Sequence, residues 1–196
     1  MKPIERSEVL GLGDYEQIRE RFRARVLEQK QKRRVSIGHR MSALFENRDT
    51  VLLQIQEMLR TERITEEKAI QHEIETYNEL VPKAGQLSFT LFVEVDDRDE
   101  RERMLVACAG MEKAVYLSVD GERFPATITS RAGLSDSRTT AVQYYLVDVG
   151  DEAAERLREG HVKQVTLGVD HPAYRQHAAL SAETIAQLGG DLAWSG

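Results

Sequence analysis

The sequence has very little cysteine and no long apolar run. A single cysteine, Cys108, among 196 residues excludes an internal disulfide framework and is typical of a reducing cytoplasm. No segment approaches the roughly 20 apolar residues of a membrane-spanning helix, and residues 1–13 lack the apolar core of a secretory signal peptide. We therefore expect a cytoplasmic protein without a membrane segment.

The common catalytic signatures are missing as well. The sequence contains no GxGxxG, GxxxxGKS/T, CxxC, HExxH or GxSxG motif. His72 and Glu73 start an HExxH pattern, but its second histidine is absent, so the zinc-protease signature is excluded. These absences leave the cofactor unknown and give no reason to expect a bound metal.

The composition is that of an ordinary globular protein, with 41% hydrophobic and 31% charged residues and a net charge of −6. The patterning predicts one α+β domain. We expect it to be helix-rich over residues 1–84 and sheet-rich over 85–180, with a short C-terminal helix over 181–190. N-terminal helices, including an antiparallel helical hairpin, would pack on a mostly antiparallel sheet.

Positive charge is concentrated near the N-terminus. Residues 16–34 contain eight basic and three acidic side chains, and the basic ones all lie within 19–34. Such a helix could contact nucleic acid or phosphate. Packing against the protein's own acidic surface or an acidic partner is the more ordinary role of a charge run. An acidic body repels a nucleic-acid backbone, which further disfavours that partner.

Helical periodicity predicts three helices before the sheet. The first is expected to be capped by Asp14, and the second to begin near Asn47 or Asp49, whose side-chain oxygens can cap orphan amides. The third is expected to start at a Thr65 cap and to end at Pro82. A short connection between the second and third helices favours the antiparallel hairpin.

Alternating apolar residues predict the strands of the C-terminal half. Asp120–Gly121 has the signal of a type I′ hairpin turn, and Pro125 indicates an edge strand or a bulge. We expect a polar loop over residues 130–138 and the last strand over 161–170.

The polar side chains around the second and third helices are the main candidates for a site. In a ligand-binding protein or enzyme, an arginine here would bind an anion, and a carboxylate would act as general base or metal ligand. The alternative is a buried structural network in which Glu46 or Glu73 holds Arg48. A di-metal site is disfavoured because neither helix has a Glu-x-x-His pair. The candidates are Glu46, Arg48, Gln56, Glu57, Glu73, Tyr77 and Asn78.

Asp170 and His171 are secondary candidates. They adjoin the segment HPAYRQH, which ends in a second histidine, His177, and is predicted to be a loop. The pair could hold a metal only with further ligands from elsewhere, and loop histidines are more often structural. Cys108 lies on a partly apolar segment and is expected to fill the core.

The chain resembles a bacterial family without a known activity, the domain of unknown function 3501 family. The resemblance is carried by four blocks spread over almost the full length: FENRDTVLLQIQEML, IQHEIETYNELVP, TAVQYYL and GVDHPAYR.

Genes of this family are often found near those of rubrerythrin and of an iron–sulfur protein similar to a heterodisulfide-reductase subunit. The resemblance therefore implies a non-catalytic accessory or binding protein in oxidative-stress or electron-transfer chemistry. Its partner would be a rubrerythrin-like or iron–sulfur protein, and a homo-oligomer also stays open. One cysteine cannot hold an iron–sulfur cluster on thiolates alone.

Overall fold

The computed structural model describes residues 1–129 and 134–193 and confirms the α+β fold class. Its helices are η1 (Arg6–Glu8), α1 (Leu12–Arg33), α2 (Arg48–Thr61), α3 (Glu67–Asn78), α4 (Arg98–Ala107), η2 (Met111–Lys113), α5 (Gly150–Arg158) and α6 (Ala182–Ala193). Its strands are β1 (Arg34–Ile37), β2 (Met41–Glu46), β3 (Gln86–Val93), β4 (Val115–Val119), β5 (Glu122–Ile128), β6 (Val142–Asp148), β7 (Val165–His171) and β8 (Tyr174–Ala179). No described helix is long and apolar enough to cross a membrane.

The strands form one antiparallel sheet in the order β1-β2-β3-β6-β5-β4-β7-β8. Within β5, Pro125 pairs with β4 only, and pairing with β6 begins at Ala126. Strand β5 lies inside the sheet, between β6 and β4, so the prediction of an edge strand at Pro125 is wrong; the proline is tolerated because pairing with β6 begins only after it. The sheet curls, and its two ends approach where the Tyr174 hydroxyl of β8 donates to the Ile37 carbonyl of β1.

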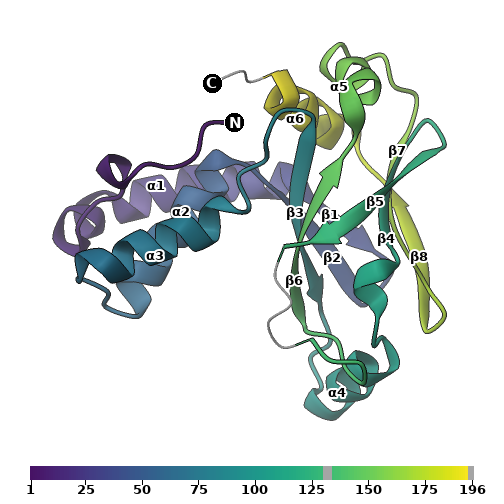
Figure 1. Ribbon diagram of the computed structural model, residues 1–196, viewed down its shortest axis with the longest axis horizontal. Helices are drawn as coiled ribbons and strands as arrows, with labels where there is room; N and C mark the ends of the chain where they lie inside the picture. Colours follow the sequence, from purple (N-terminus) through teal and green to yellow (C-terminus); the bar gives the residue numbers. More distant parts are fainter. Residues whose placement is uncertain (130–133, 194–196) are drawn as a thin grey trace.

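Helices cover the curled sheet on several sides. The first three helices gather beside β1, β2 and β3, at the left of Figure 1, whereas α4 lies at one end of the sheet and α5 and α6 at the other. The α2–α3 hairpin forms as expected, because only residues 62–66 connect these helices.

Two apolar clusters lie on opposite sides of strand β6, whose Tyr145 belongs to the inner cluster and whose Tyr144 packs against the outer one. The inner cluster fills the curled sheet and includes Phe45, Phe89 and Tyr145. The outer cluster joins α2, α3 and the N-terminal segment, and it includes Ile55 and Ile74. Because side chains alternate along a strand, the even-numbered residues of β2, β3 and β6 face the helices.

Several element boundaries differ from the sequence predictions. Helix α1 begins at Leu12 after Gly11, so Asp14 lies in the first turn and not at the cap. Helix α3 begins after Glu66, not at Thr65, and ends at Asn78, well before Pro82. The chain turns away from the helix earlier than proline alone would require.

The C-terminal part contains one strand more than expected. Strand β7 is followed by β8, so the segment HPAYRQH is a hairpin and the prediction of a loop there is wrong. The final helix has the expected Ser181 cap and runs to Ala193 instead of residue 190. The polar loop expected over residues 130–138 lies partly outside the described residues, and in its described part Ser135 and Arg138 form a β-bridge.

Candidate functional site

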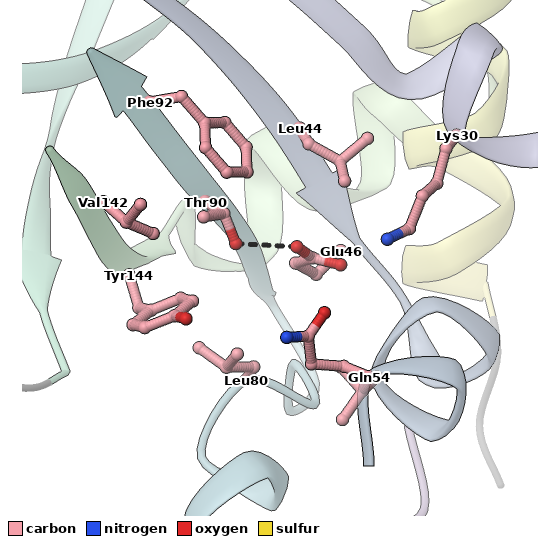
Figure 2. A pocket seen from close by; sticks show the side chains of 10 residues that line it. Lys30, Leu44, Glu46, Gln54, Leu80, Thr90, Phe92, Val142 and Tyr144 are labelled. Atoms are coloured by element: carbon pink, nitrogen blue, oxygen red, sulfur yellow. Dashed lines mark hydrogen bonds between the residues drawn. The ribbon is translucent and has the colours of Figure 1, made fainter. Parts of the chain in front are cut away.

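A small pocket lies between the helices and the outer face of the sheet. It encloses about 70 Å³, room for a few heavy atoms, whereas a drug-sized ligand needs roughly 300 Å³ or more. Strands β2, β3 and β6 form its floor, and α1, α2 and the segment after α3 form its rim (Figure 2). The lining residues are Lys30, Leu44, Glu46, Val51, Gln54, Leu80, Thr90, Phe92, Val142 and Tyr144.

Glu46, the last residue of β2, brings a carboxylate into this pocket. The residue is only 8% exposed. Its Oε1 accepts a hydrogen bond of 2.6 Å from the Thr90 hydroxyl, and its Oε2 accepts one from the Thr50 hydroxyl. In the described part of the chain Glu46 makes no ion pair. An ionised carboxylate has about four acceptor positions, so part of its capacity is not used by these two donors.

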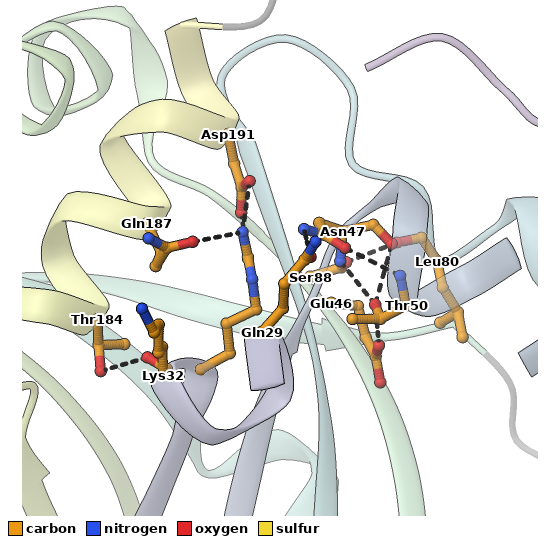
Figure 3. Close-up of polar contacts among 11 residues, drawn as sticks. Gln29, Lys32, Glu46, Asn47, Thr50, Leu80, Ser88, Thr184, Gln187 and Asp191 are labelled. Atoms are coloured by element: carbon orange, nitrogen blue, oxygen red, sulfur yellow. Dashed lines mark hydrogen bonds and ion pairs between the residues drawn. The ribbon is translucent and has the colours of Figure 1, made fainter. Parts of the chain in front are cut away.

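The cap of α2 fixes the position of Glu46. Asn47 Oδ1 accepts from the Thr50 N–H at 2.9 Å, and the Asn47 N–H donates to the Thr50 hydroxyl oxygen at 2.9 Å. The Thr50 hydroxyl in turn donates to Glu46, and the Asn47 carbonyl lies 3.0 Å from it as a second acceptor (Figure 3). Asn47 is therefore the helix cap that the sequence predicts, and it also orients the carboxylate.

Two tyrosines and an amide lie close to the carboxylate. Burial raises the pKa of Tyr144, and the nearby Tyr77 and Glu46 raise it further. Burial also raises the pKa of Tyr77, an effect that its hydrogen bond with Gln54 opposes and that the charge of Glu73 reinforces. Both phenols therefore stay protonated near neutral pH and can donate hydrogen bonds.

Arg48 is not part of the pocket, and the prediction that Glu46 or Glu73 holds it is wrong. Its guanidinium pairs with Glu8, lowering the pKa of that carboxyl, and donates to the Lys2 carbonyl at 3.0 Å. Arg48 therefore holds the N-terminal segment, residues 1–11, and is engaged as an anchor within the protein.

Gln56 and Asn78 bind the same N-terminal segment through its backbone. The Gln56 amide pairs with both the N–H and the C=O of Leu10, at 2.7 and 3.2 Å. The Asn78 amide does the same with Ile4, at 2.8 and 2.9 Å. Each amide satisfies both backbone groups of one residue, as a neighbouring strand would. These two candidates are structural.

Glu57 ties α1 to α2. It accepts from the Tyr15 hydroxyl at 2.7 Å and from two guanidinium nitrogens of Arg19 at 2.8 and 2.9 Å. Arg19 lowers the pKa of Glu57 below its ordinary value, with a smaller contribution from Tyr15. This carboxylate is fully engaged within the protein.

The basic segment 19–34 largely pairs with acidic groups of the same chain. Arg25, Lys32 and Arg34 form ion pairs with Asp49, Glu183 and Glu94. The deepest pair joins Arg33 to Asp191 of α6 at 2.6 Å, with both side chains buried. Figure 3 shows Asp191 and Gln187 on the α6 side of this contact. These contacts agree with the self-packing alternative for the segment.

The secondary candidates are held by structural contacts. Asp170 accepts from Arg175 at 2.7 Å and from Arg123 at 3.4 Å. His171 Nε2 lies 3.0 Å from the Ala109 carbonyl, and its Nδ1 accepts from the Ala173 N–H. This pair of contacts is that of a neutral ring with its proton on Nε2.

The described residues contain no group of three or more His, Cys, Asp and Glu side chains suited to a metal ion. Cys108 is buried in the inner cluster, and burial raises the pKa of its thiol, which disfavours the reactive thiolate.

The structure thus separates the seven main candidates. Glu46 lines the pocket, Tyr77 hydrogen-bonds to the lining residue Gln54, and Glu73 lies near enough to Tyr77 to act on its pKa. The other four hold helices or the N-terminal segment. Sequence reasoning did not identify Lys30, Thr90 and Tyr144 as pocket residues. For Thr90 and Tyr144, strand alternation was the available signal, since both lie on the face of the sheet that carries Glu46.

The fold and the pocket define an α+β protein in which a helical layer and a curled antiparallel sheet enclose a small polar site. The chain belongs to the family described as protein of unknown function (DUF3501), whose model matches residues 3–192. It is similar to a protein of unknown function from Burkholderia pseudomallei K96243, known from a crystal structure. The two share 34% sequence identity with a TM-score of 0.89, over 97% of this chain and 100% of that chain. None of the curated proteins matches the sequence.

Proposed function

We propose that the protein binds a small ligand in the pocket and recognises it through Glu46. The observation that carries the proposal is a buried carboxylate that faces a cavity and is held only by neutral hydroxyl donors. Removing a charge from water is costly unless a partner compensates for it. A ligand with a positively charged hydrogen-bond donor, such as an ammonium group, would supply that partner.

The surroundings of Glu46 support a binding role better than a purely structural one. The Thr50 and Thr90 hydroxyls donate to different oxygens of Glu46, which uses one acceptor position on each and leaves the others free for a ligand. Gln54 and Tyr144 add polar groups on other walls of the same cavity. Polar groups that converge in an otherwise apolar cavity are the usual arrangement of a small-molecule site.

A titration with methylammonium, the smallest alkylammonium probe, tests the proposal. Backbone amide NMR signals of residues next to Glu46 should shift in a saturable manner with the wild-type protein. In Glu46→Gln the affinity should fall about tenfold or more, equivalent to ~1.4 kcal/mol. Glu73→Gln, at a residue that does not line the pocket, is the matched control and should bind normally. The proposal fails if wild type shows no saturable shift or if Glu46→Gln binds equally well.

A second role, as a cytoplasmic accessory to a redox protein, is our proposal from the family resemblance. Its structural support is an exposed apolar side chain: Val106 of α4 is 51% exposed, on a helix whose first six residues are all charged. The partner would be a rubrerythrin-like or iron–sulfur protein. Affinity purification of the tagged protein from its native host should recover such a partner, and repeated recovery of other proteins alone would count against this role.

A further inference from the structure

The pocket has a second ionisable group, Lys30. It reaches the rim from α1, and its ammonium group points toward the side of Glu46 in Figure 2. Among the described residues Lys30 makes no ion pair. The next basic residues of the same segment, Lys32 and Arg33, are each paired with an acidic side chain. Lys30 is therefore a cation directed at the cavity and left without a direct partner.

Two opposite charges thus border one small cavity without contacting each other. Charges interact more strongly at the edge of a protein than in bulk water, because the effective dielectric constant is lower there. An ammonium ligand at Glu46 is repelled by Lys30, and a carboxylate ligand at Lys30 is repelled by Glu46. A ligand that carries both charges gains from both residues and avoids both repulsions. The arrangement therefore discriminates against simple cations and simple anions.

The size of the cavity limits the ligand further. About 70 Å³ is enclosed, and the remaining walls are largely apolar, with Leu44, Phe92 and Val142 among them. Only a short carbon chain fits between the two charged ends.

We propose that the ligand is a small amino acid-like zwitterion, with its ammonium group on Glu46 and its carboxylate on Lys30. The proposal rests on the ligand-binding function proposed above and names its ligand class. Gln54 and Tyr144 are placed to complete the hydrogen bonds of the two charged groups.

The test compares glycine, L-alanine and β-alanine with methylammonium and acetate as NMR titrants. With wild type, at least one amino acid should bind about tenfold or more tightly than either singly charged probe. In Lys30→Met that advantage should disappear, while methylammonium binds as well as before or better. Glu46→Gln should weaken the amino acids and methylammonium alike. Lys68→Met, an exposed lysine on α3, is the matched control and should retain wild-type affinities.

The outcomes separate this inference from the function on which it rests. If methylammonium binds through Glu46 as tightly as the amino acids, and Lys30→Met changes no ratio of affinities, the zwitterion proposal is overturned and the binding function stands. If no probe binds to wild type, both are overturned. Lys30 is half-buried on a helix surface, so its variant should fold, which the amide spectrum verifies.

Discussion

Glu46 and Glu57 are the same residue type, but their hydrogen-bond partners differ. These partners decide which of the two carboxylates can bind a ligand and which one only stabilises the fold. Glu46 lies two residues before helix α2 and Glu57 lies within it, so both carboxylates belong to the same short stretch of the sequence. Glu57 is held by a guanidinium and a phenol, whereas Glu46 has two neutral hydroxyls and a cavity. The sequence predicts both residues as site candidates, because their partners lie on other elements and cannot be recognised from the local sequence.

The structural role of Glu57 predicts a pH-dependent loss of stability in Glu57→Gln. Arg19 holds the pKa of Glu57 below its ordinary value of 4.5. A depressed carboxyl pKa stabilises the fold above the unfolded value and ceases to do so as pH falls through the folded value. The variant should lose about 1 kcal/mol of unfolding free energy at pH 7. The difference from wild type should shrink below pH 4.5.

Urea unfolding at pH 7 and pH 3 measures both differences. Glu73→Gln provides the control, because Glu73 makes no hydrogen bond or ion pair in the described residues. A difference between Glu57→Gln and wild type that stays constant across this pH range would contradict the assignment.

At the scale of elements, the sequence predicts the helices and strands that their own residues define. The Asn47 cap and the Asp120–Gly121 turn are both confirmed. Strand β8 is missed because it is an edge strand with mostly exposed side chains, so it has no apolar alternation. Lys30 is missed because its position at the pocket depends on how α1 crosses β2, which no local pattern encodes.

Two neighbouring glycines of α6 make a matched test of how closely α5 and α6 pack. A Cβ at Gly189 would lie 2.5 Å from the Leu157 carbonyl oxygen, whereas at Gly190 it would meet nothing within 4 Å. Gly189→Ala should therefore destabilise the protein by about 1–3 kcal/mol, since backbone must move. Gly190→Ala should stabilise it by up to about 1 kcal/mol through helix propensity.

Thermal and urea unfolding of the two variants gives the comparison directly. The change in unfolding free energy is expected to be a loss for Gly189→Ala and a gain for Gly190→Ala, although the two substitutions are chemically identical and adjacent in the chain. Equal effects of both substitutions would show that the α5–α6 contact is looser than the structure has it.

At the scale of the whole molecule, the pocket lies between the helical layer and the outer face of the sheet, on the opposite side of the strands from the inner cluster. Strands β2, β3 and β6 contribute odd-numbered residues to the inner cluster and even-numbered residues to the pocket floor. The buried Arg33–Asp191 pair adds a second connection, between α1 and α6. A ligand in the pocket would therefore contact both the helical layer and the sheet.

Because Tyr144 of β6 packs against the outer cluster and Tyr145 of the same strand lies in the inner one, we predict that the chain unfolds as one cooperative unit. Melting the helices would expose the outer face of β2, β3 and β6, whose inner face holds the other cluster. Ile55→Val, in the outer cluster, should lower stability by about 0.5–1.5 kcal/mol. It should shift the urea midpoints of far-UV and tyrosine near-UV circular dichroism by the same amount. Two separate transitions, with only the helical one moved by Ile55→Val, would instead show that the helical layer and the sheet fold independently.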